Sequence, residues 1–254
     1  MTYIFTGLII FIIGLVIGSF SNVCIYRIPR NESIVFPGSH CPGCNQLIKW
    51  YDNIPLFSYL FLKGKCRNCK INISWQYPLV ESLTGFIYFF LFYFYGLQIL
   101  TLAYMLFSSV LIIITFIDLK EKIIPDVLSI PFLALGFLFS FLRQDFSPLD
   151  SLLGVLAGGG SLFLIAMAGS FFFKKEAMGG GDIKLAAMTG AFLGWQSTLL
   201  ALFLGFFIGS VTGIIILMRN KNKLSDTALP FGPFIAVGSI ITLFLGEFII
   251  NWYF

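Results

Sequence analysis

Residues 99–118 read ILTLAYMLFSSVLIIITFID, a run of 19 uncharged and mostly apolar residues that ends on an aspartate. A helix needs about 20 apolar residues to cross the hydrocarbon core of a bilayer, so this run predicts a membrane span. An ionisable residue inside or at the edge of a span is costly and usually has a function. The stretch therefore indicates a membrane fold and a candidate site residue, Asp118.

The rest of the chain has the same character as this run. Of its 254 residues, 58% are hydrophobic and only 11% are charged, less than half of the roughly 25% charged residues of a typical soluble domain. This composition excludes a soluble globule, a disordered region, a coiled coil and a soluble nucleic-acid-binding module. The small excess of 16 Lys and Arg over 12 Asp and Glu gives no reason to expect a nucleic-acid partner.

Working outward from residues 99–118, we predict an all-α polytopic membrane protein with about eight transmembrane helices. The first run, Tyr3 to Val23, has no basic residue before it, so it is expected to be a retained anchor and not a cleaved signal peptide. The other spans are predicted near 79–96, 99–117, 126–142, 151–173, 183–195, 197–218 and 229–250. Closely packed membrane helices are indicated by glycines four residues apart, as in Gly154/Gly158, Gly190/Gly194 and Gly205/Gly209/Gly213.

One polar insertion between the first two spans sets the domain organisation. We expect residues 1–23 to form the first transmembrane helix, 24–78 a loop domain and 79–254 the polytopic membrane domain. With eight spans, 15 of the 16 basic residues fall on the side of this loop and only Arg143 falls on the other. Because cytoplasmic loops attract Lys and Arg, both termini are expected outside and the loop in the cytoplasm.

Four of the five cysteines lie in this loop as two Cys-x-x-Cys pairs, Cys41/Cys44 and Cys66/Cys69, with 21 residues between the pairs. Four thiolates at such spacing are typical of a tetrahedral, structural zinc site. Cytosolic thiols stay reduced, which disfavours disulfides here. Two redox-active pairs or unconnected thiols are the alternatives. His40 could replace a ligand but is expected to be a bystander.

A second aspartate is expected at the same end of the membrane helices as Asp118. The sequence Gly179-Gly-Gly-Asp182-Ile-Lys184 opens the sixth predicted span, and antiparallel helices bring its start to the level of the end of the third. Two facing carboxyl groups share a proton, so one can activate water while the other polarises a peptide carbonyl, as in aspartic proteases. The glycines would let an extended substrate backbone approach. A helix N-cap for Asp182 and a surface acid for Asp118 are the alternatives.

Two further acids lie near the ends of predicted spans. Asp126 follows Pro125 at the start of the fourth span, where it could cap the helix or add a third acid to the site. Glu81, near the start of the second span, needs a partner. A proton-coupled transporter with Asp118, Asp182 and Glu81 as a relay is one alternative function, but the internal repeats usual in transporters are not visible. A zinc-dependent membrane assembly protein without an active site is another.

Taken together, these segments resemble the type IV prepilin peptidases, a family of leader peptidase/N-methyltransferases. The resemblance runs nearly from end to end of the chain. The stretches that carry it are residues 18–29, 41–44, 50–55, 63–66, 73–81, 118–131, 179–184 and 229–233. Each stretch is modest evidence alone, but their order along the chain is specific.

The resemblance implies a GxGD-type aspartyl protease membrane core with a zinc-ribbon-like cytoplasmic loop between helices 1 and 2. It implies an endopeptidase of the bacterial cytoplasmic membrane that removes the basic leader of type IV prepilins and pilin-like proteins on the cytoplasmic side, after a glycine. Asp118 and Asp182 take the place of the catalytic pair, and Asp126 is expected to cap and shape the fourth span. The residues expected to support the pair are Gly179, Gly180, Gly181, Lys184 and Asp126.

The family also methylates the new N-terminal residue with S-adenosylmethionine. No glycine-rich dinucleotide-type loop in this chain predicts that cofactor independently. Gly64 and Lys65, beside Cys66, match a family segment associated with methyl transfer, so they are expected to contribute to it. The complete set of cysteines favours a chain with both activities. A zinc-folded docking surface for the basic leader is the alternative, poorly matched because the loop has seven basic residues against two acids.

Overall fold

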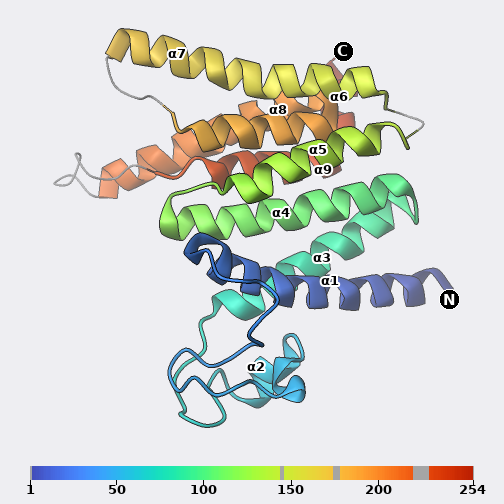
Figure 1. The fold of residues 1–254 in the computed structure, drawn as a ribbon. Helices are drawn as coiled ribbons and strands as arrows, with labels where there is room; N and C mark the ends of the chain where they lie inside the picture. Colours follow the sequence, from blue (N-terminus) through green and yellow to red (C-terminus); the bar gives the residue numbers. More distant parts are fainter. Residues whose placement is uncertain (1, 144–145, 174–177, 220–228, 254) are drawn as a thin grey trace. The chain divides into compact units, whose positions relative to one another are not determined.

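The computed structural model describes residues 2–143, 146–173, 178–219 and 229–253, and these form helices and turns without a named β-strand (Figure 1). By length and composition, six of the described helices could cross a membrane. The prediction of an all-α polytopic membrane protein is therefore confirmed. The chain divides into two compact units, residues 1–101 and 102–254.

The first unit contains two long helices that pack against each other along their length. α1 (Thr2–Arg27) continues beyond the predicted end of the span at residue 23, and it contacts α3 (Gln76–Tyr95). A Cβ on Gly14 would lie 2.8 Å from Gly85 Cα, and a Cβ on Gly18 would lie 2.7 Å from the Cα of Glu81. Only glycine allows backbones to approach this closely. The sequence prediction missed the Gly14/Gly18 pair, although its spacing follows the same rule as the pairs it named.

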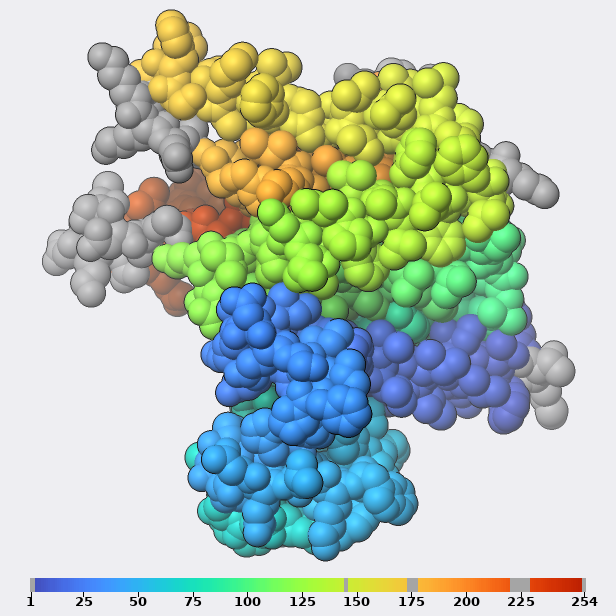
Figure 2. All heavy atoms as spheres, viewed as in Figure 1, coloured from blue at the N-terminus to red at the C-terminus, as the bar shows by residue number. Residues whose placement is uncertain are grey.

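A loop module of residues 28–75 connects these two helices; it is drawn in blue to cyan in the space-filling view (Figure 2). It contains the 3-10 turns η1 (Ile28–Arg30) and η2 (Trp50–Asn53), the short helix α2 (Phe57–Phe61) and the two cysteine pairs. All of its residues are described, and Cys41 is the only buried one. A module of this size without an apolar core needs another source of stability, such as a metal.

The second unit consists of packed helices with a conventional apolar core. Its elements are α4 (Ile99–Glu121), α5 (Asp126–Ser140), α6 (Pro148–Val155), the π-helical turn η3 (Leu156–Gly160), α7 (Ser161–Phe173), α8 (Gly180–Arg219) and α9 (Gly232–Tyr253). The buried rings of Phe107 and Phe192 stack with their centroids 4.8 Å apart. Gly154 of α6 lies directly against Gly190 of α8, as expected for glycines in a membrane-helix contact.

The predicted number of eight transmembrane helices is not confirmed. The difference from the six long apolar helices lies in two places. α8 contains both of the expected spans 183–195 and 197–218, and α5, at the expected span 126–142, has only 15 residues.

α8 nevertheless reverses direction within its length. Gly194 has φ 76° and ψ 175°, which lies outside the helical region. A Cβ on Gly158 would touch both Ala186 and Thr198 of α8, two residues that would be about 18 Å apart in a straight helix. The chain therefore folds back at Gly194, and both ends of α8 lie on the same side of the view in Figure 1.

Arg143, the one basic residue expected on the far side of the membrane, lies at this reversal. Its guanidinium donates to the Phe192 carbonyl at 3.0 Å and lies over the Phe146 ring at 4.3 Å. A cation at a helix end stabilises carbonyl groups that have no partner within the helix. Arg143 also contacts the ring of Tyr104, near the start of α4, whereas Asp118 is in the last turn of that helix. The two residues thus lie at opposite ends of α4, and the side of the membrane that each of them faces stays a prediction.

Candidate functional site

Asp118 is buried near the end of α4. The backbone N–H of Gly232, the first residue of α9, donates to its Oδ2 at 3.0 Å. A Cβ at position 232 would lie 2.6 Å from that oxygen, so only glycine allows α9 to begin this close to the carboxyl group. The alternative of a surface acid is therefore wrong. The sequence prediction missed Gly232, although a glycine between Phe231 and Pro233 at the start of a span was a visible signal.

Asp182 lies half-buried in the first turn of α8, which begins at Gly180, so it is inside the helix and not at its N-cap. Ile124 connects this turn to the surroundings of Asp118. Its side chain lies 2.8 Å from the position of a Cβ on Gly181 and 3.1 Å from that of a Cβ on Gly232. Because Gly181 is next to Asp182 and the N–H of Gly232 donates to Asp118, the two aspartates lie in the same part of the unit. Their catalytic role stays a prediction.

The three glycines before Asp182 differ in their surroundings. A Cβ on Gly179 would lie 3.3 Å from Asp182 Oδ2, and one on Gly181 would collide with Ile124. A Cβ on Gly180 would meet nothing within 4 Å. Gly180 is therefore exposed at the start of α8, and Gly181 packs against Ile124. The approach of a substrate backbone to these glycines stays a prediction.

Lys184 and Asp126 form an ion pair beside this site. Lys184 Nζ lies 2.7 Å from both carboxylate oxygens of Asp126, and both side chains are exposed. Asp126 is the first residue of α5, but no side-chain hydrogen bond caps that helix. The predicted capping role of Asp126 is therefore wrong. Its carboxylate instead joins the start of α5 to the start of α8.

Glu81 has a partner within the first unit. It is buried in α3, and the backbone N–H of Leu56 donates to its Oε2 at 2.8 Å. Leu56 has φ 60° and ψ −51°, a region that a non-glycine residue occupies only when its surroundings hold it there. The partner that the sequence required for Glu81 is thus a backbone group of the loop module.

The four cysteines of the loop module converge on one point. Their Sγ atoms all lie within 4.8 Å of one another, and those of Cys41 and Cys69 are 3.7 Å apart. Sulfurs bound to one tetrahedral zinc ion at about 2.3 Å would be roughly 3.8 Å apart, so the donor set fits this metal. Backbone N–H groups of Cys69 and Asn68 lower the pKa of the Cys66 thiol to about 6, whereas desolvation and hydrogen bonds with the neighbouring thiols raise the pKa of Cys69 to about 11. The first thiolate of the cluster is therefore favoured at Cys66.

The two cysteine pairs have the same backbone structure. In each, the N–H of the first cysteine donates to a carbonyl five residues later, at 3.0 Å for Cys41 and 2.9 Å for Cys66. His40 and Lys65 take equivalent positions just before the pairs, each in an isolated β-bridge. The His40 ring lies 3.3 Å from the Gly38 carbonyl and is not part of the sulfur cluster. The fold therefore accounts for His40 without a role as a ligand.

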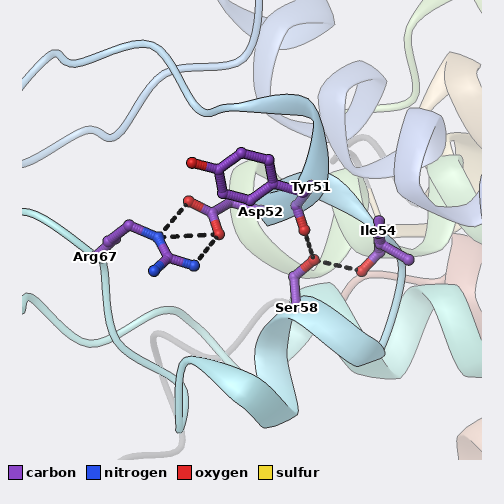
Figure 3. Close-up of polar contacts among 5 residues, drawn as sticks. All are labelled: Tyr51, Asp52, Ile54, Ser58 and Arg67. Atoms are coloured by element: carbon purple, nitrogen blue, oxygen red, sulfur yellow. Dashed lines mark hydrogen bonds and ion pairs between the residues drawn. The ribbon is translucent and has the colours of Figure 1, made fainter.

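An ion pair connects the second cysteine pair to η2 (Figure 3). Arg67 donates from Nε to Oδ2 of Asp52 at 2.8 Å and from Nη2 to Oδ1 at 2.6 Å. Hydrogen bonds from the Arg67 guanidinium hold the pKa of Asp52 below its usual range. In α2, Ser58 Oγ donates to the carbonyls of Ile54 and Tyr51 at 2.7 and 3.2 Å. The metal site, η2 and α2 are thus linked by side chains.

Gly64 and Lys65, the residues expected to contribute to methyl transfer, lie directly before Cys66. Gly64 has φ 67°, and a Cβ there would lie 2.9 Å from Tyr59 Oη, so this glycine is needed by the local fold. The Tyr59 ring lies 5.4 Å from that of Trp75, and Lys65 is exposed. Aromatic rings and a lysine have the chemistry to hold the adenine and carboxylate of S-adenosylmethionine. A role of Gly64 and Lys65 in methyl transfer stays a prediction.

Known proteins match this chain along almost its whole length. Residues 12–95 match the family model of the bacterial peptidase A24 N-terminal domain, and residues 105–214 match that of the type IV leader peptidase family. A prepilin leader peptidase/N-methyltransferase of Aeromonas salmonicida (strain A449) is 38% identical over 272 residues, covering 96% of this chain and 92% of the relative. No solved structure matches the chain.

Relatives with the same name occur in other bacteria. Those of Pseudomonas aeruginosa and Neisseria gonorrhoeae are 35% and 33% identical, and each alignment covers 95% of this chain. The alignments cover 91% and 92% of these relatives. The residues that match the first model include the four clustered cysteines, and those that match the second include Asp118 and Asp182. The chain therefore belongs to the type IV leader peptidase family.

Proposed function

We propose that this membrane protein cleaves the basic leader from type IV prepilins or pilin-like proteins and then methylates the newly exposed N terminus. The observation that carries the proposal is the proximity of Asp118 and Asp182 at one end of a membrane-helix unit in a chain of this family. Both activities appear in the names of its relatives.

Asp118 and Asp182 act as an aspartic-protease pair in this proposal. The ionised carboxyl group takes a proton from water, and the water oxygen attacks the carbonyl carbon of the scissile bond. The protonated carboxyl group gives its proton to the carbonyl oxygen. As the tetrahedral intermediate collapses, the C–N bond breaks and the amine takes up a proton. The Gly232 N–H fixes the orientation of Asp118 during these steps.

The substrate backbone approaches the pair at Gly180, where the structure leaves open space. We place this end of the helices and the loop module in the cytoplasm, because 15 of 16 basic residues belong to that side. A prepilin that is anchored by its apolar helix would present its leader at the same face.

The second activity uses the amine that cleavage releases. When bound, S-adenosylmethionine supplies the methyl group. A zinc ion on Cys41, Cys44, Cys66 and Cys69 would have no open coordination position, so it would fold the loop module and take no part in the chemistry. Gly64 and Lys65 lie at the edge of that metal site and are the proposed contributors to methyl transfer.

Leader removal from a purified prepilin, scored by mass with the full-length protein in lipid nanodiscs, tests the proposal. Asp118→Asn and Asp182→Asn should each lower the cleavage rate by at least about 10³-fold. Glu247→Gln is the matched control, because Glu247 is an exposed acid of the same unit. Cleavage at the wild-type rate by either aspartate variant would show the peptidase mechanism to be wrong. A gain of one methyl group that depends on added S-adenosylmethionine tests the second activity.

A further inference from the structure

The short helix α2 presents an apolar face to its surroundings. Phe57, Leu60 and Phe61 are 59%, 71% and 84% exposed. Because helical residues three and four positions apart are neighbours, these three side chains lie on one face. Such a cluster of large apolar side chains marks a contact with a partner or a membrane.

The hydrogen bond between Leu56 and Glu81 fixes the level of α2 along the membrane helices. At a rise of 1.5 Å per residue, Glu81 lies about 7.5 Å along the helix axis from the start of α3. The 20 residues of α3 are just enough to cross about 30 Å of hydrocarbon. On α1, Gly18 packs against Glu81 and lies about 13.5 Å before the helix end at Arg27. Leu56 directly precedes α2. α2 therefore begins beside the membrane-spanning part of the two helices, not beyond their ends.

The residues around α2 have the chemistry of a membrane interface. Trp50, in the preceding turn, is exposed, as are Lys63 and Lys65 just after α2. Tryptophan and lysine are favoured at the level of the lipid headgroups. Amphipathic helices that lie in this boundary combine such residues with an apolar face.

We propose that α2 lies in the phospholipid bilayer at the boundary between headgroups and acyl chains. Phe57, Leu60 and Phe61 contact acyl chains, and Lys63 lies at phosphate groups. Ser58 and the Arg67–Asp52 pair connect this helix to the metal site (Figure 3). The loop module is thus held to the membrane by its own apolar contact in addition to α1 and α3.

Tryptophan fluorescence of the full-length protein in nanodiscs tests this placement. The four natural tryptophans are replaced by phenylalanine, and Phe61→Trp supplies one probe. Phe36→Trp is the matched control, because Phe36 is 77% exposed in the same module. Its loop is held at the end of α1, where Arg27 donates to the carbonyls of Ser33 and Pro37 at 2.8 and 2.7 Å. Bound zinc verifies folding, and Leu60→Trp is the second probe if Phe61→Trp does not fold.

Lipids brominated near the carbonyl end of the acyl chain should quench the probe at position 61 about threefold more than the probe at 36, and aqueous acrylamide should show the reverse order. Equal acrylamide quenching at both positions would overturn the proposal, because α2 would then face water. Protection of position 61 from both quenchers would also overturn it, since protein would then cover the apolar face.

The same probe tests Glu81 as the residue that fixes the level of α2. Adding Glu81→Ala removes the acceptor of the Leu56 N–H, so acrylamide quenching at position 61 should rise toward that of the control probe. Unchanged quenching with both quenchers would show that Glu81 does not hold α2 at this level.

Discussion

The loop module of residues 28–75 and the helical unit from residue 102 onward are stabilised in different ways. The loop module buries only Cys41 and brings four sulfurs together. The helical unit buries large side chains such as Phe107 and Phe192, and its glycines let helices touch. We therefore predict that the loop module depends on a bound metal, whereas the helical unit depends on the fit of its own side chains.

Removal of the metal should have the largest effect, and it should be confined to the loop module. A structural zinc site contributes an apparent 10–16 kcal/mol of binding free energy (about that range in zinc-finger peptides), which is folding free energy for a module without a core. A strong chelator, or Cys41→Ser, should unfold residues 28–75 and abolish methyl transfer. Hydrogen exchange should show lost protection there and unchanged protection in α4 and α8.

Cys24→Ser is the control for this prediction, because Cys24 is the one cysteine outside the cluster and lies in α1. It should keep its zinc and its methyl-transfer activity. If zinc leaves and residues 28–75 keep their protection from exchange, the proposed difference between the two regions is wrong.

A substitution at the contact between α6 and α8 should have the next largest effect, now confined to the helical unit. In Gly190→Val, the added side chain would overlap the backbone of Gly154. Overpacking costs about 1–3 kcal/mol where neighbours can shift, and backbone atoms shift least. We expect a lower thermal midpoint of this unit and a loss of leader cleavage, with zinc content unchanged.

Gly160→Ala provides the comparison, since a Cβ there meets nothing within 4 Å. It should retain the wild-type midpoint and cleavage rate. Loss of zinc from Gly190→Val would contradict the independence of the two regions.

The ion pair between Lys184 and Asp126 should contribute less, because exposed pairs are worth about 0–1 kcal/mol. Lys184→Met should leave the thermal midpoint nearly unchanged. It should lower the cleavage rate by less than about tenfold, because the first turn of α8, which contains Asp182, would shift slightly. The exchanged pair, Lys184→Asp with Asp126→Lys, should recover part of that loss. If the loss of cleavage rate in the double variant equals the losses of Lys184→Asp and Asp126→Lys combined, the two charges do not interact.

Sequence patterns could predict features that depend on local composition. Apolar runs predicted the membrane helices, two Cys-x-x-Cys pairs predicted the cluster of four sulfurs, and the alternating direction of spans predicted that Asp118 and Asp182 lie at one end of the helices. Partners far apart in the chain could not be predicted in this way. The carboxyl group of Asp118 meets the N–H of Gly232, 114 residues away, because of how α9 packs, which no local pattern records.

The same limit explains the wrong prediction for Asp126. Its position after Pro125 is typical of a helix cap, but Lys184, 58 residues away, provides a charged partner. The reversal of α8 shows the opposite case. Two spans separated near residue 196 were expected, and the chain does turn near this residue. The turn lies at Gly194, to which the sequence pattern assigned only a role in helix packing. Position along a span was thus easier to predict than the partner of a side chain.

The smallest effect should come from the pair between Asp52 and Arg67, which supports the loop module beside its metal. The pair is half-exposed on the arginine side, so Asp52→Asn should cost no more than about 1 kcal/mol of module stability. The pKa of Asp52 in the fold is below its usual value. The contribution of the ionised Asp52 to the stability of the loop module is therefore complete above about pH 4 and is lost only as the pH falls through the folded pKa. The deficit of Asp52→Asn should therefore stay constant between about pH 5 and pH 8.

Hydrogen exchange of residues 28–75 in the zinc-loaded protein measures this deficit at several pH values. Glu32→Gln, which alters the other acid of the loop module, should show none, because Glu32 is exposed. A deficit that already shrinks as the pH falls from about 8 to 5 would mean that a group with a higher pKa, such as a thiol, controls the contact. The Asp52–Arg67 pair would then itself depend on the bound metal. In that case the metal alone would account for the stability of the loop module.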